Sequence, residues 1–241
     1  MYQADRLHAF AAESDSLAVV TSSEELKQVL KSREDGSKLI AGLLGTEGSH
    51  ALDGDLDNIR RLYDAGFRMM SLQHFFDNKL GGSLHGESND GLTEFGREAV
   101  RLMDSMGIMI DVSHSSPQVV DDVLNLIDSP LIVSHTGFKG HCDRKRNISD
   151  DLIMRIAERG GLMGVGFWSE AVCGTDVTAI ADAIAYGVET FGVEAVALGS
   201  DWDGAVTTPI AANDLAYLTS ALLKRGLSLI HISEPTRRRH I

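Results

Sequence analysis

Residues Gly107–Gly140 read GIMIDVSHSSPQVVDDVLNLIDSPLIVSHTGFKG. This segment predicts a strand, a helix and a second strand, because two apolar runs flank a stretch whose apolar residues recur at helical spacing. The runs end in Ser113-His114 and in Ser134-His135. Parallel strands joined by a crossover helix place both histidines at the same carboxyl edge of a sheet. One histidine at a strand end is usually structural, but the repeat on consecutive strands indicates a metal site.

The same alternation of apolar strands and amphipathic helices continues on both sides of this segment. A repeat of roughly 30 residues in this order fits a (β/α) barrel of the TIM type better than an open, doubly wound sheet. The fold class is therefore α/β, and active sites on this fold lie at the carboxyl ends of the strands. The expected strands are 38–45, 67–72, 108–112, 131–133, 162–168 and 195–200.

Most of these strands are followed by a residue that can carry chemistry. Two neutral imidazoles and a carboxylate are ordinary zinc ligands, and a carboxylate can also bridge two metals. A histidine and an acid outside such a set could serve as an oxyanion donor and a proton shuttle. Taken alone, the carboxylate that ends the first strand is better explained by a surface turn or a helix cap. The five strand-end residues are Glu47, His74, His114, His135 and Asp201.

Two further residues near these strand ends have competing interpretations. Arg146 follows His135 in a basic segment, and a guanidinium can hold a carboxylate through two parallel hydrogen bonds. On the sequence alone, a solvated side chain within the run Arg144-Lys145-Arg146 is the simpler interpretation. The loop 75–91 is long, polar and rich in glycine, which is typical of an active-site cover. We expect His85, within this loop, to be solvated.

Composition excludes several functional classes. The net charge of −13 argues against a nucleic-acid partner, whereas 43% hydrophobic and 24% charged residues are ordinary for a globular chain. No strand is followed by G-x-G-x-x-G, and neither a P-loop nor a G-x-S-x-G motif occurs, so nucleotide-binding and serine-hydrolase functions have no support. No apolar run could span a membrane and the start is not a signal peptide, so we expect a cytoplasmic protein.

The cysteines and the C-terminal segment give two more expectations. Cys142 and Cys173 are too few for a disulfide framework, so we expect either a reducing compartment or no redox role, and we assign Cys142 no function. The stretch LSLIHISEPTR can be back-translated codon for codon into a transposon adapter used in sequencing libraries. We therefore interpret 227–241 as a cloning or assembly scar after a domain at 1–226. The alternative is a genuine strand at 229–232 followed by a basic tail.

Six segments, in order, resemble the successive motifs of the membrane dipeptidase (renal dipeptidase) family of zinc peptidases. The resemblance covers most of residues 5–226 and implies a (β/α)8 barrel. It also implies two Zn²⁺ ions in a complete site and hydrolysis of small dipeptides to amino acids through a metal-bridged hydroxide. The six segments are LLGTEGSHAL, RMMSLQH, GLTEFGREAVRLMDSMGIMIDVSHSS, PLIVSHTG, RNISDD and ALGSDWDG.

The resemblance implies a role for each candidate residue. Glu47 matches the carboxylate that bridges both metals, and His114 and His135 match the ligands of the second metal. The remaining residues would contact substrate. In this reading, His74 faces the scissile group, Arg146 takes the substrate carboxylate and Asp201 is the acid beside the attacking water.

The chain also departs from the family pattern. The family's first strand carries a His-x-Asp pair that completes the first metal site, and no such pair precedes Glu47. The segment 227–241 stands where an eighth strand belongs. We therefore expect an incomplete barrel that contains strands two to seven of eight. Its two unpaired edge strands would favour association, so a homo-oligomer is possible. Such a fragment is expected to be a weak dipeptidase or an inactive one.

Two other functions remain open from the sequence. The first is another metal-dependent amidohydrolase on the same barrel, acting on an ester, a lactone or a cyclic amide. A substrate of that kind without a free carboxylate would leave Arg146 idle. The second is a non-catalytic barrel protein in which the strand-end residues form a satisfied polar network.

Overall fold

The computed structural model describes residues 2–228. In chain order, the elements are α1 (Tyr2–Ala12), β1 (Leu17–Val19), α2 (Ser23–Glu34), β2 (Ile40–Gly42), β3 (Leu44–Thr46), η1 (His50–Leu52), α3 (Asp57–Asp64), β4 (Phe67–Ser71), α4 (Glu94–Ser105), β5 (Met109–Asp111), α5 (Pro117–Leu126), β6 (Ile132–Thr136), α6 (Asp150–Glu158), β7 (Leu162–Val165), α7 (Ser169–Val172), α8 (Val177–Phe191), η2 (Val193–Ala195), β8 (Val196–Leu198), η3 (Ala212–Asp214) and α9 (Leu215–Leu223).

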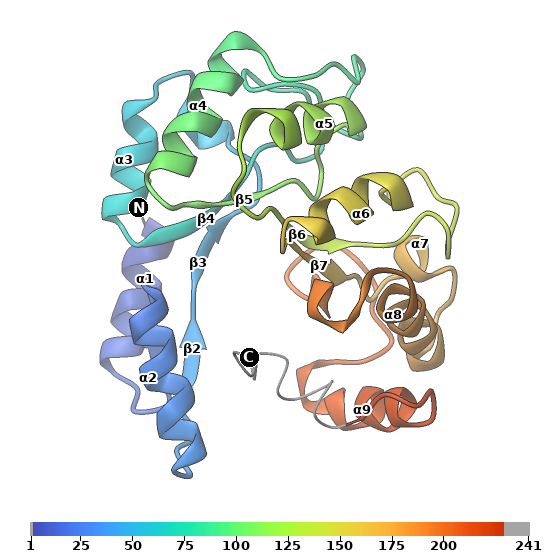
Figure 1. Cartoon of the computed structure of the whole chain (residues 1–241). Coiled ribbons are helices and arrows are strands. Elements are labelled where there is room, and N and C mark those ends of the chain that lie inside the picture. Colours follow the sequence, from blue (N-terminus) through green and yellow to red (C-terminus); the bar gives the residue numbers. More distant parts are fainter. Residues whose placement is uncertain (1, 229–241) are drawn as a thin grey trace.

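The main sheet has six parallel strands in the order β3-β4-β5-β6-β7-β8, so each strand pairs with its successor in the chain. Helices α3, α4, α5, α6 and α8 lie along the outer side of this curved sheet (Figure 1). This is the arrangement of a (β/α) barrel, and it confirms the predicted fold class. Within residues 2–228, β3 and β8 do not pair with each other, and the sheet is not closed.

The strand predicted at 38–45 differs from the observed structure. It divides at Leu43 into β2 and β3, and β2 pairs with β1 in a separate parallel two-stranded sheet. Strand β1 was not predicted, because a strand of three residues is too short to show a periodic pattern. The other five predicted strands are present, with ends that differ from the prediction by a few residues.

The start of α5, the helix between β5 and β6, is held in place next to His114. Ser116 caps α5, with its Oγ accepting a hydrogen bond from the Val119 backbone N–H at 3.1 Å, and Pro117 occupies the first helical turn. The apolar face of α5 is buried against the sheet, including Val123 and Leu124. The cap therefore ends the β5 segment just after His114, and burial of the helix anchors the turn that carries this histidine.

The two cysteines are paired, which was not predicted from their small number. Cys142 and Cys173 form a disulfide across a sequence separation of 31 residues. One lies in the loop after β6 and the other directly after α7, and the pairing of β6 with β7 brings these segments together. Two cysteines this far apart give no pairing signal in a single sequence, because only the topology makes them neighbours.

Two further predictions concern the ends of the chain and the membrane. Of the predicted scar, only Leu227 and Ser228 belong to the described part, and Leu227 packs against the core. The alternative strand at 229–232 lies outside the described residues. Among the helices of residues 2–228, none combines the length and the apolar character needed to cross a membrane.

Candidate metal centre

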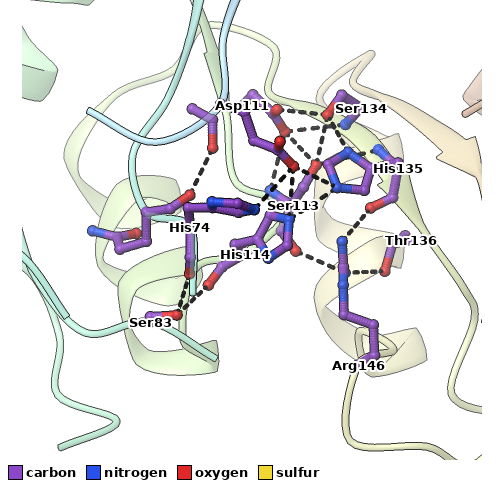
Figure 2. A network of polar contacts seen from close by, with 12 residues as sticks. His74, Ser83, Asp111, Ser113, His114, Ser134, His135, Thr136 and Arg146 are labelled. Atoms are coloured by element: carbon purple, nitrogen blue, oxygen red, sulfur yellow. Dashed lines mark hydrogen bonds and ion pairs between the residues drawn. The ribbon is translucent and has the colours of Figure 1, made fainter. Parts of the chain in front are cut away.

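Three of the predicted side chains converge at the carboxyl ends of β3, β5 and β6. The Glu47 Oε1 atom lies 3.0 Å from His114 Nε2 and 3.1 Å from His135 Nε2, and the two Nε2 atoms are 2.9 Å apart. The register explains this convergence, because Asp111 pairs with Ile132 and each histidine lies three residues further along its strand. Figure 2 shows the two imidazoles facing each other.

His74 and Asp201 flank this triangle on two sides. His74 Nε2 lies 3.6 Å from Glu47 Oε1, and the His74 ring makes an edge contact with the His114 ring. The Asp201 carboxylate lies within 4.8 Å of the ligand atoms of Glu47 and His135. Asp201 has a left-handed backbone (φ 58°), and a Cβ at Gly204 would lie 2.3 Å from its Oδ1. The DWDG turn is thus shaped around this carboxylate.

The electrostatics of the centre favour an ionised acid and a neutral imidazole. The hydrogen bond from His114, and the closeness of His135, hold the pKa of Glu47 well below its usual range. Burial lowers the pKa of His114 to about 4, even though its hydrogen bond to Glu47 acts in the opposite direction. Burial also raises the pKa of Asp201. At neutral pH the centre therefore presents a carboxylate beside an uncharged imidazole, the protonation states that metal ligands require.

The donor set fits a divalent metal. Three ligand atoms separated by 2.9, 3.0 and 3.1 Å form a nearly regular triangle. In a tetrahedral zinc site with bonds of about 2.0–2.1 Å, ligand atoms are separated by about 3.3 Å, only slightly more than observed. Two Nε2 lone pairs at this separation would repel each other unless a proton or a cation lay between them. His74 and Asp201 each extend this set into a group of three candidate ligands that includes Glu47.

Arg146 is buried beside the centre, so its interpretation as a solvated side chain is wrong. It is only 8% exposed. Nη1 donates to the Ser113 carbonyl at 2.9 Å, and Nη2 donates to the His135 carbonyl at 2.9 Å. Nη1 also reaches Thr136 Oγ1 at 3.4 Å. Burial lowers the Arg146 pKa to about 10, which still leaves the guanidinium charged at neutral pH.

The hydrogen bonds of Arg146 do not use all the N–H groups of its guanidinium. A guanidinium has five N–H donors, and three of them are used by Ser113, His135 and Thr136. Among residues 2–228, Nε and the second Nη2 proton have no hydrogen-bond partner. The guanidinium therefore keeps two N–H donors that the described protein groups do not engage.

His85 was expected to be solvated, and this is also wrong. Its ring packs 5.1 Å from the Phe75 ring and 5.5 Å from the His114 ring, measured between centroids. Burial lowers its pKa, and its Nε2 atom is buried without a hydrogen-bond partner in the described structure. The loop that carries His85 folds back over the centre, and its many polar residues obscured this in the sequence.

A polar layer beneath the histidines was not identified from the sequence as functional. Asp111 is 1% exposed, and the side chains of Ser113 and Ser134 hydrogen-bond to its carboxylate. The available signal was the repeated Ser-His pair, in which a serine precedes each metal-ligand candidate. Asp111 gave a second signal, because a carboxylate inside an apolar strand needs partners.

The sequence does contain one His-x-Asp triplet, but it lies away from the centre. His141-Cys142-Asp143 occupies the loop after β6. Its histidine ring packs against Tyr186 of α8, its cysteine is in the disulfide, and its aspartate lies 3.9 Å from Lys139 Nζ. This triplet therefore cannot replace the pair that the family carries on its first strand.

A cavity of about 400 Å³ opens on the inner side of the sheet next to the centre. Glu47, His135 and Asp201 line it, together with Leu43 and Leu198 from the two outer ends of the sheet. Leu43 and Leu198 are exposed, because β3 and β8 do not pair within the described residues. The cavity therefore joins the candidate ligands to solvent through the open side of the sheet.

A curved parallel sheet that gathers imidazoles and carboxylates at its carboxyl edge is the arrangement of a barrel protein with a candidate metal site. Comparison with known proteins gives the family. The model of the membrane dipeptidase family (peptidase family M19) matches residues 1–237, and the chain belongs to this family of metallopeptidases.

Individual relatives agree with this assignment. The chain is 30% identical to the dipeptidase verJ of Clonostachys rogersoniana, over 95% of this chain and 60% of that protein. Among solved structures, it superimposes on the metallopeptidase dipeptidase AC with a TM-score of 0.84 and 23% identity, covering 97% of this chain and 74% of that one. The probable dipeptidase PvdM of Pseudomonas aeruginosa gives a TM-score of 0.86 at 19% identity, covering 95% and 74%. At these identities the two structures support the fold alone.

The chain is shorter than its relatives. It spans 48% to 60% of the length of the curated relatives that it matches. The family follows from the match over residues 1–237, and the activity of this chain is addressed as a proposal below.

Proposed function

We propose that this centre is the zinc site of a dipeptidase, and that the present chain is a weakly active or inactive part of it. The observation that carries the proposal is the Glu47–His114–His135 triangle with the free edge of Arg146 at the same end of the sheet. Ligands for a metal and a donor pair for a carboxylate then lie within one centre, as hydrolysis of a small substrate with a free carboxyl terminus requires.

Glu47, His114 and His135 would hold the metal. Bound there, Zn²⁺ would act as a Lewis acid toward the scissile carbonyl and lower the pKa of an attacking water to about 7. A second ion would share Glu47, but the pair that completes its site in the family does not precede Glu47 in this chain. We therefore propose about one tightly bound zinc per chain.

The other residues would bind the substrate and move protons. The unused Nε and Nη2 protons of Arg146 would hold the carboxylate of the dipeptide. Asp201, whose pKa is raised by burial, would accept a proton from water and return it to the leaving amine. His74 would donate a hydrogen bond to the oxygen on which negative charge develops.

Zinc binding by the full chain tests the metal assignment. After removal of metal with a chelator, we expect elemental analysis and calorimetry to give about one zinc per chain. His135→Ala should lose this site, whereas His141→Ala, which removes a histidine of the loop after β6, should retain it. A folded chain that takes up no zinc would overturn the metal assignment and favour a satisfied polar network.

Ligand binding tests the substrate assignment, even if the chain does not turn over. The zinc-loaded chain should bind a dipeptide about 10- to 100-fold more tightly than the same dipeptide with a C-terminal amide, since hydrogen bonds to a charged group contribute about 1.5–3 kcal/mol. Equal binding of acid and amide would mean that Arg146 is idle. The alternative amidohydrolase, acting on an ester, a lactone or a cyclic amide, would then be favoured.

A further inference from the structure

Asp111 has no place in the proposed chemistry, yet it is one of the most densely hydrogen-bonded side chains near the centre. Its Oδ1 accepts from the backbone N–H of Ser113 and of Ser134, each at 3.0 Å, and from Ser113 Oγ at 2.5 Å. Its Oδ2 accepts from Ser134 Oγ at 2.6 Å. A buried carboxylate thus joins the carboxyl ends of β5 and β6, next to the two histidines (Figure 2).

Ser134 connects this carboxylate to the centre. Its Oγ lies 2.8 Å from His135 Nδ1 as well as 2.6 Å from Asp111 Oδ2. A serine hydroxyl has a single hydrogen to donate, and a carboxylate is the stronger acceptor. The hydroxyl hydrogen therefore goes to Asp111, and Ser134 Oγ must accept a hydrogen from His135 Nδ1.

The direction of these bonds fixes the tautomer of His135. A neutral imidazole with its hydrogen on Nδ1 carries a lone pair on Nε2. That Nε2 is the atom that faces Glu47 Oε1 at 3.1 Å and His114 Nε2 at 2.9 Å. The serine thus leaves His135 with its ligand atom unprotonated and aimed into the centre before any metal binds.

His114 has no such support. Its Nδ1 is buried without a hydrogen-bond partner in the described structure. In the metal-free centre, His114 carries its hydrogen on Nε2, where Glu47 Oε1 at 3.0 Å and His135 Nε2 accept it. The two histidines therefore differ, because His135 is already in the ligand tautomer and His114 must change its tautomer when a metal binds.

We propose that Asp111 and Ser134 are positioning residues which hold His135 in the Nδ1–H tautomer and so prepare it as a metal ligand. Groups that hydrogen-bond to the second nitrogen of a metal-binding histidine typically change metal affinity by about 10- to 100-fold. Ser113 provides a control, because it also binds Asp111 and its Oγ lies 2.9 Å from Ser134 Oγ, but it has no contact with His135 Nδ1. Its Oγ instead accepts from the His135 backbone N–H at 3.2 Å.

Nitrogen NMR of the imidazoles tests the tautomer without any metal. In the metal-free full chain, we expect His135 to show a protonated Nδ1 and an unprotonated Nε2, with its signals assigned by their loss in His135→Gln. Ser134→Ala should shift His135 toward the Nε2–H tautomer, Ser134→Thr should restore Nδ1–H, and Ser113→Ala should leave it unchanged. An unchanged tautomer in Ser134→Ala, or an equal change in Ser113→Ala, would overturn the proposal.

Zinc affinity provides a second measurement, which rests on the proposed metal centre. By calorimetry, Ser134→Ala should weaken zinc binding about 10- to 100-fold, whereas Ser113→Ala should have a much smaller effect. Equal zinc affinity in Ser134→Ala and the unaltered chain would count against the proposal. If no variant binds zinc, the metal assignment fails while the tautomer measurement still decides the role of Ser134. Asp111→Asn is less informative, since it disturbs four hydrogen bonds and can unfold the chain.

Discussion

His114 and His135, from neighbouring strands, point their Nε2 atoms at each other across 2.9 Å, and the Glu47 carboxylate completes the triangle. This arrangement puts two imidazoles in a buried position where a positive charge is poorly solvated. It therefore has consequences for stability as well as for metal binding.

The first prediction concerns the acid stability of the metal-free chain. Because burial lowers the pKa of His114 to about 4, the folded state binds fewer protons than the unfolded state between about pH 4 and pH 6.5. The free energy of unfolding should be unaffected by this group above pH 6.5. It should fall by roughly 2–3 kcal/mol as the pH drops toward 4.

Urea unfolding at several pH values measures this effect. His85, whose pKa is also lowered by burial, acts in the same direction. His114→Gln should therefore flatten the pH dependence only in part, and the double change of His114 and His85 to Gln should remove most of it. A free energy of unfolding that does not change between pH 6.5 and 4.5 would contradict the lowered pKa of His114. Below pH 4.5, protonation of Glu47 adds a further loss, because its folded-state pKa is depressed.

The second prediction concerns stabilisation by metal. A ligand that binds only the folded state stabilises it by about 2.7 kcal/mol at a free concentration of 100 times Kd. Zinc should therefore raise the melting temperature of the full chain. Glu47→Gln should abolish most of this rise, since the triangle loses its only carboxylate. Glu87→Gln, in the exposed part of the loop 75–91, should leave the rise intact. A zinc-induced rise that survives in Glu47→Gln would place the metal elsewhere.

The third prediction separates the structural role of Arg146 from its role in binding. Arg146→Met would leave the carbonyls of Ser113 and His135 buried without donors, at a cost of about 1–3 kcal/mol each. The free energy of unfolding should therefore fall by several kcal/mol. Arg144→Met is the matched control, because Arg144 is exposed in the same basic run, and should change stability by less than about 0.5 kcal/mol. Equal losses in the two variants, measured by urea unfolding, would contradict this account.

The order of strands and the convergence of the site could be predicted from the sequence for a simple physical reason. Apolar runs of three to eight residues separated by amphipathic helices specify parallel strands, and in such a sheet the carboxyl end of every strand lies at one edge. The positions of Glu47, His114 and His135 follow from that rule alone, without a calculation of any side-chain contact.

The features that were missed depend on contacts distant in sequence. The burial of Arg146 results from carbonyls on two strands, and the disulfide of Cys142 with Cys173 results from the adjacency of β6 and β7. His85 is covered because its loop turns back over the ring of His114. In each case the local sequence is polar or irregular, so composition indicates solvent exposure while tertiary packing decides otherwise.

The last prediction concerns the disulfide, which closes a loop with a sequence separation of 31 residues around Arg146. The chain-entropy model gives about 3–4 kcal/mol of stabilisation for a loop of this size. Reduction should therefore lower the free energy of unfolding by up to that amount. The double variant Cys142→Ser with Cys173→Ser should show the same loss and become insensitive to reductant.

Because Asn147 also binds this loop, donating from Nδ2 to the Cys142 carbonyl at 2.8 Å, the reduced chain should keep Arg146 near its place. We therefore expect zinc binding to survive reduction, and a loss of zinc binding together with the disulfide would show that the centre depends on this covalent link.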